Sequence, residues 1–169
     1  MNRSANKSMG RFGESVTAEY LTREGYEILE RNYRSDGGEI DIIAKRGVRL
    51  AFVEVKLRSV SAAGYARGSA AVTYAKQQRI IKTALKYIRA LRAAGQTYGD
   101  FNPCFDVAEL VYEEFDSERG EKLCAVKINY ITSAFGVRGY GEHYGDGYHR
   151  YGSQYGYGGS RYPDNDTDN

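Results

Sequence analysis

Asp41, Glu54 and Lys56 have the types and spacing to hydrolyse a phosphodiester bond with the help of a metal ion. Asp41 ends the segment GGEID at residues 37–41, and the other two lie in FVEVK at residues 52–56. Glu54 and Lys56 are two positions apart in a run rich in β-branched and aromatic residues, so their side chains should leave the same face of a strand. The three residues therefore form a candidate site on a β-sheet.

A predicted hairpin places Asp41 opposite Glu54. Strand-forming runs at residues 39–44 and 50–57 flank a charged turn that contains Gly47. If the turn is centred just after this glycine, Asp41 pairs with Glu54. Because like charges directly opposite each other destabilise a sheet, a bound divalent cation would relieve this pair.

Two convergent carboxylates, supplemented by a backbone carbonyl and waters, suit Mg²⁺ or Mn²⁺. These ions keep several waters and accept phosphate oxygens as ligands. Asp41 and Glu54 are the expected metal ligands. The metal would lower the pKa of a bound water and offset charge on the scissile phosphate, while Lys56 could orient the attacking water or stabilise the transition state.

The wider pattern resembles a known bacterial family. An acid in a first helix, then an aspartate, a short hairpin and ExK, is similar to the PD-(D/E)xK nuclease superfamily. Over roughly residues 10 to 136 the chain resembles the YraN family of predicted nucleases, whose fold is similar to that of archaeal Holliday junction resolvases. The segments that carry this resemblance are, in order, GESVTAEYLTREGYEILERNYR (13–34), GGEIDIIAKRGVRLAFVEVKLR (37–58), YAKQQRIIKTALKYI (74–88), PCFDVAEL (103–110) and ITSAF (131–135).

The resemblance implies an α/β fold, a mixed sheet flanked by helices with a restriction endonuclease-like αβββαββ core. It also implies a site, carried over position by position onto this sequence. The superfamily's proline before the aspartate is replaced here by Ile40. The implied catalytic residues are Glu14, Asp41, Glu54 and Lys56, with Glu39 and Lys76 as accessory candidates.

The function that the resemblance implies is a metal-dependent endonuclease, with DNA favoured over RNA and branched DNA as a substrate by analogy with resolvases. A homodimer is expected on the same ground, because cutting both strands of a junction needs two sites. Two alternatives stay open: a nucleic-acid-binding module that cleaves nothing, and a protein whose carboxylates hold a fold-stabilising cation. The acidic pair favours the enzyme, because a binding module would not need it within a basic surface.

Composition bounds the other function classes. A chain of 169 residues, 41% of them hydrophobic, suits one well-packed domain. Residues 1–100 hold 18 Lys and Arg against 10 Asp and Glu, whereas the remainder holds 6 against 12, so the basic half suits a polyanionic substrate such as nucleic acid. Both histidines, His143 and His149, lie in the C-terminal tail, which excludes a His-based triad or zinc site from the folded part.

Cys104 and Cys124 have no CxxC spacing and indicate buried thiols in a reducing compartment. No apolar run approaches the roughly 18 residues needed to span a bilayer. The first ten residues, MNRSANKSMG, also lack the apolar segment of a signal peptide. We therefore expect a cytoplasmic protein without a membrane partner.

The first predicted helix carries Glu14. Apolar residues recur at helical spacing over residues 11–25, and Gly25 supplies a C-terminal stop. Glu14 would then lie in the first turn, where the positive end of the helix dipole favours an ionised carboxylate. Residues 26–34 are the predicted first strand, and residues 35–38 form a turn into the hairpin.

The second predicted helix, residues 73–94, has one apolar face and one basic face. Its basic face, together with the Gly- and Ala-rich loop at residues 59–72, could contact a nucleic-acid backbone without reading bases. A solvated charged face is the alternative interpretation. The candidate nucleic-acid-binding residues are Arg58, Arg67, Lys76, Arg79 and Lys82.

After this helix, residues 104–114 and 122–131 predict an antiparallel pair of strands. Asp106, among apolar neighbours, is interpreted as a hydrogen-bonded structural residue rather than a metal ligand. Three segments follow from the whole pattern. They are a flexible N-terminus at 1–10, an endonuclease-like domain at 11–135, and a disordered Gly- and Tyr-rich tail at 136–169.

Overall fold

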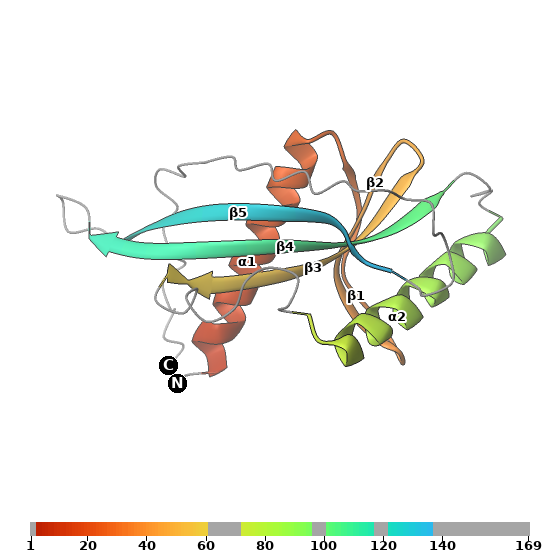
Figure 1. The fold of residues 1–169 in the computed structure, drawn as a ribbon, viewed down its shortest axis with the longest axis horizontal. Helices are drawn as coiled ribbons and strands as arrows, with labels where there is room; N and C mark the ends of the chain where they lie inside the picture. The colour runs from red at the N-terminus through yellow and green to blue at the C-terminus, as the bar shows by residue number, and fades with distance from the viewer. Residues whose placement is uncertain (1–2, 61–71, 96–100, 117–121, 137–169) are drawn as a thin grey trace, which may run out of the picture.

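Five strands form one mixed sheet, and a helix packs against each of its faces (Figure 1). The computed structural model describes residues 3–60, 72–95, 101–116 and 122–136. The order of the elements confirms the predicted α/β fold with an αβββαββ core. The elements are α1 (Arg3–Arg23), β1 (Glu27–Ser35), β2 (Gly38–Arg46), β3 (Arg49–Ser59), α2 (Tyr74–Ala93), β4 (Asn102–Asp116) and β5 (Lys122–Phe135).

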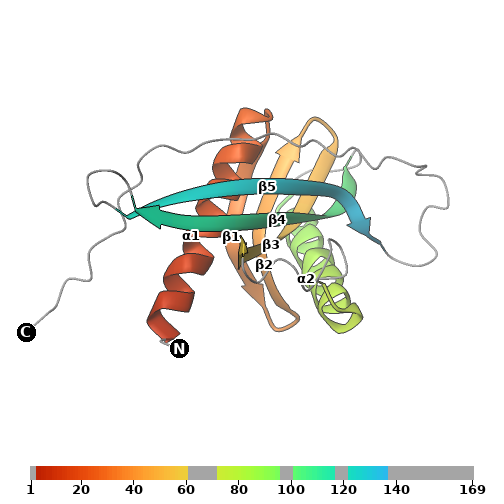
Figure 2. The ribbon, with the colours of Figure 1, turned by 60° about the vertical axis from the view of Figure 1, so that its left-hand side comes forward.

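The strands lie in the sheet in their chain order, β1-β2-β3-β4-β5. Neighbours pair antiparallel except β3 and β4, which are parallel. A parallel pair needs a crossover connection, and α2 supplies it. The sheet therefore carries α2 on one face, while α1 covers the other (Figure 2).

Two hydrophobic cores, one under each helix, fix which way the strand residues point. Leu21 of α1 packs in the same core as Val53, whereas Ile80 of α2 packs with Phe52. Because strand residues alternate between faces, Glu54 lies on the α2 face together with Phe52. Val53 therefore points into the core under α1, on the side of the sheet away from Glu54.

The hairpin of β2 and β3 has the predicted register. Ile42 pairs with Val53, and the pairing runs down to the turn, where Gly47 has a positive φ of 57°. The ladder stops at Ile42 and Val53, one position before Asp41 would meet Glu54. Asp41 therefore lies where the two strands begin to separate.

The first helix starts earlier than predicted. It begins at Arg3 rather than at residue 11, so residues 3–10 are helical. No proline interrupts this stretch, and a single glycine such as Gly10 costs a helix only about 1 kcal/mol. Glu14 consequently lies in the middle of α1, and its predicted place in the first turn is wrong. The dipole argument for this residue fails with it, because that effect fades within one turn.

The remaining predicted elements match within a few residues: β2, β3, β4 and β5 are longer than predicted, β1 is shifted by one residue, and α2 is one residue shorter at each end. α2 is capped by Thr73, whose side chain accepts a hydrogen bond from the backbone N–H of Lys76. The predicted loop at residues 59–72 lies mostly outside the described part of the chain, and Arg67 lies there with it. The tail from residue 137 onward, with both histidines, lies outside it as well.

Asp106 is a structural residue, as its sequence context predicts. Its carboxylate is fully buried and lies 2.6 Å from a guanidinium nitrogen of Arg49. It also accepts hydrogen bonds from the Tyr130 hydroxyl at 2.7 Å and from the backbone N–H of Ser133 at 2.8 Å. These bonds tie the start of β3 to β4 and β5, and they leave the carboxylate committed to the fold.

Candidate functional site

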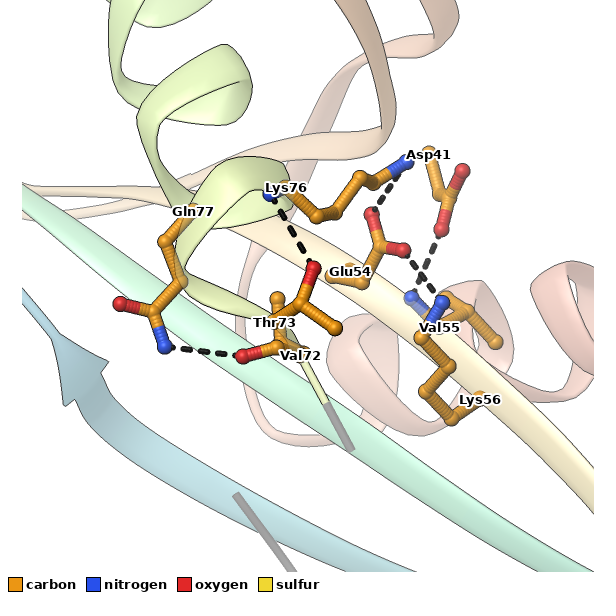
Figure 3. A network of polar contacts seen from close by, with 8 residues as sticks. All are labelled: Asp41, Glu54, Val55, Lys56, Val72, Thr73, Lys76 and Gln77. Atoms are coloured by element: carbon orange, nitrogen blue, oxygen red, sulfur yellow. Dashed lines mark hydrogen bonds and ion pairs between the residues drawn. The ribbon is translucent and has the colours of Figure 1, made fainter. Parts of the chain in front are cut away.

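Glu54 is the centre of the candidate site. Only 2% of its surface is exposed, yet two ammonium groups reach it (Figure 3). Lys56 Nζ lies 2.6 Å from Oε1, and Lys76 Nζ lies 3.1 Å from Oε2. The Lys76 contact is an ion pair without hydrogen-bond geometry, so Oε2 has no hydrogen-bond donor within the described part of the chain. A buried carboxylate needs positive charge of the kind that these two ammonium groups supply, and Oε2 remains able to bind a cation.

Asp41 closes the gap where β2 and β3 separate. Its Oδ2 accepts a hydrogen bond from the backbone N–H of Val55 at 2.7 Å, as a strand carbonyl would (Figure 3). Burial and then the negative charge of Glu54 raise the pKa of Asp41 from 3.8 to about 7, despite the lowering effects of the Val55 bond and of Lys76. The two carboxylates therefore repel each other, as the predicted pairing requires.

Glu14 approaches the same point from α1. Its negative charge adds to the raised pKa of Asp41, which places the two carboxylates within electrostatic reach of each other. The Asn32 side chain of β1 donates a hydrogen bond to Glu14 Oε2 at 2.8 Å. Asn32 lies between Arg31 and Tyr33, whose partners on β2, Ile42 and Ile40, flank Asp41. One asparagine thus holds Glu14 beside the aspartate.

Asn32 is a site residue that the sequence analysis missed. Its φ of 54° is in the left-handed region, which non-glycine residues seldom adopt and which asparagine tolerates best. Backbone strain of this kind costs on the order of 1–3 kcal/mol and gathers at functional sites. The signal that could have identified it is its low strand propensity, because asparagine is depleted in strands and Asn32 lies inside one.

The other predicted site residues in the described part of the chain lie on β2, β3 and α2. Glu39 forms an ion pair with Arg34, whose Nε lies 2.9 Å from Glu39 Oε2, so Glu39 contacts a neighbouring arginine rather than the carboxylate pair. Arg58 is half-buried near the end of β3. Arg79 and Lys82 are exposed on α2. The structure thus brings together Asp41, Glu54, Lys56 and Lys76, with Glu14 beside them.

The donor set fits a magnesium or manganese ion. Within residues 3–60, 72–95, 101–116 and 122–136, no group of three or more His, Cys, Asp or Glu is arranged to hold a metal. Mg²⁺ does not need such a group, since proteins bind it through one or two carboxylates and several waters. Glu54 Oε2, without a hydrogen-bond donor, and the raised pKa of Asp41 both indicate a place that favours added positive charge.

Comparison with known proteins gives a family match. The model of "Uncharacterised protein family UPF0102" matches residues 13–110, the range that contains every carboxylate and lysine of the site. A UPF0102 protein of Caldanaerobacter subterraneus subsp. tengcongensis is 37% identical over 135 residues, which cover 80% of this chain and 100% of the relative. Relatives from Alkaliphilus metalliredigens and Geobacter sulfurreducens are each 42% identical over 130 residues, covering 77% of this chain and 99% or 90% of the relative.

Without metal, Asp41 should make the protein less stable as the pH rises from about 4 to about 7. In this window the native state holds a proton that the unfolded chain has lost, because the pKa is about 7 in the fold and 3.8 outside it. Asp41→Asn should therefore remove this slope and raise the free energy of unfolding at pH 8 by roughly 2–4 kcal/mol. Urea denaturation in chelator at pH 5 and pH 8 measures both quantities. The exposed acid Glu27 supplies the control, Glu27→Gln, and an unchanged slope in Asp41→Asn would contradict the geometry.

Asn32→Gly should weaken metal binding while leaving the stability of the fold nearly unchanged. Glycine adopts the left-handed conformation without strain, so the free energy of unfolding should change by no more than about 1 kcal/mol. The variant lacks the donor to Glu14, and the loss of such an orienting partner typically costs about 10–100-fold in metal affinity. Calorimetric titration with Mn²⁺ alongside thermal unfolding tests both parts. Wild-type Mn²⁺ affinity in a stable Asn32→Gly protein would show that the contact has no role in the site.

Proposed function

The chain belongs to the uncharacterised protein family UPF0102, which is the YraN family named above. We propose that the protein is a metal-dependent nuclease that hydrolyses phosphodiester bonds in DNA, branched DNA included. The observation that carries the proposal is the buried carboxylate of Glu54, held between Lys56 and Lys76 beside Asp41. Two acids and two ammonium groups at one point match the charges of a metal ion and a phosphodiester.

Asp41 and Glu54 would hold Mg²⁺ or Mn²⁺. When bound, such an ion supplies Lewis-acid stabilisation of the phosphate and a more acidic water. Lys56, fixed by its 2.6 Å contact with Glu54, keeps about a third of its side chain exposed and can reach a phosphate oxygen or the attacking water from there. Its positive charge would offset the negative charge that builds up in the transition state.

Glu14 has a different task in this proposal. It approaches from α1, on the other side of the sheet from α2, and its orientation is set by Asn32. A carboxylate held in this way can accept a hydrogen bond from a water near the two ligands. Lys76 pairs with Glu54 Oε2 and can turn to the phosphate once a metal ion supplies the positive charge that this oxygen needs.

The exposed basic residues of α2, Arg79 and Lys82, support nucleic acid as the partner, because backbone phosphates are bound by such surfaces independently of sequence. A symmetric homodimer is part of the proposal, since cutting both strands of a junction takes two sites. No helix in the described part of the chain is long and apolar enough to cross a membrane. We also propose that the protein is cytoplasmic, because thiols such as that of Cys104 stay reduced in that compartment.

Incubation of the purified protein with labelled DNA tests the proposal directly. Duplex, single-stranded, flap and four-way DNA, with structured RNA for comparison, are incubated with Mg²⁺, Mn²⁺ or chelator. We expect cleavage that requires the metal and prefers DNA. Glu54→Gln and Lys56→Ala should each lower the rate by about 10²–10³-fold, as the loss of a transition-state contact does. Glu113→Gln removes an exposed acid from β4 and serves as the matched control.

Each other result selects an alternative. Cleavage that survives Glu54→Gln would mean that a contaminant or another site does the chemistry. Nucleic-acid binding without cleavage in every metal condition would favour a binding module. Failure to bind any of these nucleic acids would leave carboxylates that hold a cation for the fold.

A further inference from the structure

A basic pocket opens beside the carboxylates and shares Lys76 with them. Its volume is about 430 Å³, within the range of roughly 300–1,000 Å³ that is usual for ligand sites. We propose that this pocket binds the backbone phosphate next to the one that is cut, in the same nucleic-acid strand. The inference rests on the proposed function, because it takes a nucleic acid as the substrate. The lining residues are Arg34, Ser35, Gly38, Glu39, Lys76 and Arg79.

The pocket exists because the β1–β2 turn lies close against α2. Gly38 has a φ of 144°, and a Cβ at this position would lie 3.4 Å from the Cβ of Arg79 and 3.4 Å from Thr83 Oγ1. A β-carbon there would already touch the helix, and the positive φ would strain any residue other than glycine. Glycine therefore allows Arg34 and Ser35, at the end of β1, to face Arg79 across the pocket.

The net positive charge of the residues that line the pocket favours the binding of an anion. Arg34, Lys76 and Arg79 contribute three positive charges against the single negative charge of Glu39. Glu39 pairs with the Nε of Arg34, at 2.9 Å, and among the described residues no ion pair occupies the two terminal nitrogens of that guanidinium, which can bind a ligand. Arg79 makes no ion pair within the part of the chain that the structure describes.

The hydrogen-bond donors suit phosphate oxygens. Ser35 Oγ accepts a hydrogen bond from the backbone N–H of Gly37 at 3.2 Å, so the serine's own proton is left to donate. Two guanidinium groups beside a hydroxyl can bind several oxygens of one phosphate, and arginine does this bidentately. No aromatic side chain is among the described residues that line the pocket, so the lining is built for the charge of a phosphate rather than for stacking a base on an aromatic ring.

The position of the pocket indicates that its ligand is a phosphate of a nucleic-acid strand rather than a free phosphate ion. Lys76 is shared, because its ammonium is 3.1 Å from Glu54 Oε2 and its side chain lines the pocket. Glu39 precedes Asp41 by two residues on β2. The Arg34 side chain is 74% exposed, so the pocket is open and a continuous strand can pass through it. Such phosphate contacts fix the register of a strand without reading its sequence.

Removal of one pocket charge tests the inference without any cleavage. Binding of labelled duplex and flap DNA in chelator is followed by fluorescence anisotropy at several salt concentrations. Arg79→Ala should weaken binding about tenfold, as the loss of a charged hydrogen bond does, and reduce the salt slope by about 1. Arg89→Ala removes the same charge from the same helix about 15 Å further along its axis, and should change neither value. Equal losses in the two variants would overturn the subsite, because they would show a general field effect.

A second measurement locates the anion. Inorganic phosphate is titrated into the labelled protein, and the amide signals of Gly38, in the pocket wall, and of Gly47, in the distant β2–β3 turn, are followed by NMR. Gly38 should shift in the wild type and not in Arg79→Ala, while Gly47 stays unchanged. An unmoved Gly38 would overturn the proposal.

Failure of the subsite and failure of the nuclease give different results. Unchanged DNA binding and unchanged kcat/KM in Arg79→Ala would reject the subsite and leave the nuclease standing. Pocket-dependent DNA binding without cleavage in any metal would reject the nuclease and keep the phosphate site. Because Arg79 is exposed, the variant should fold normally, which its thermal unfolding will confirm.

Discussion

The repulsion between two carboxylates held close together inside the protein is the constraint on which the rest of the site depends. Asp41 and Glu54 meet where β2 and β3 separate, and the chain places Lys56, Lys76 and the N–H of Val55 around them. This compensation is incomplete, since the pKa of Asp41 is still raised to about 7. A protein that only needed to fold could bury apolar residues here at no such cost. The uncompensated charge is what a divalent cation would neutralise.

The fold supplies the site from both sides of the sheet. α1 carries Glu14 and α2 carries Lys76, so the two helices approach the carboxylate pair from opposite faces. The parallel pairing of β3 with β4 requires the crossover through α2, and it is this crossover that brings the helix start to Glu54. The network of Asp106 with Arg49 fixes β3 at its other end. The candidate site and the structural network of Asp106 thus lie at different points along β3.

Local patterns predicted much of this arrangement. Alternation along β3 and a glycine turn gave the hairpin register, which brings Asp41 near Glu54 although the ladder ends one position before that pair. The helical spacing of apolar residues predicted α2. The start of α1 was not predictable, because residues 3–10 have neither a clear cap nor a helix breaker. The left-handed Asn32 and the phosphate pocket were also missed, because both arise from contacts between elements that are distant in sequence.

The most direct test of the account is a crystal structure of the protein with Mn²⁺ at pH 8, where Asp41 is ionised. Anomalous scattering would locate the ion without assumptions about the reaction. The account predicts a peak at coordination distance from carboxylate oxygens of both Asp41 and Glu54, with the Lys76 ammonium moved away from Glu54, and no such peak in Glu54→Gln. The account would be contradicted if, at saturating Mn²⁺, no anomalous peak lay between the two carboxylates, or if the ion bound only elsewhere on the molecule.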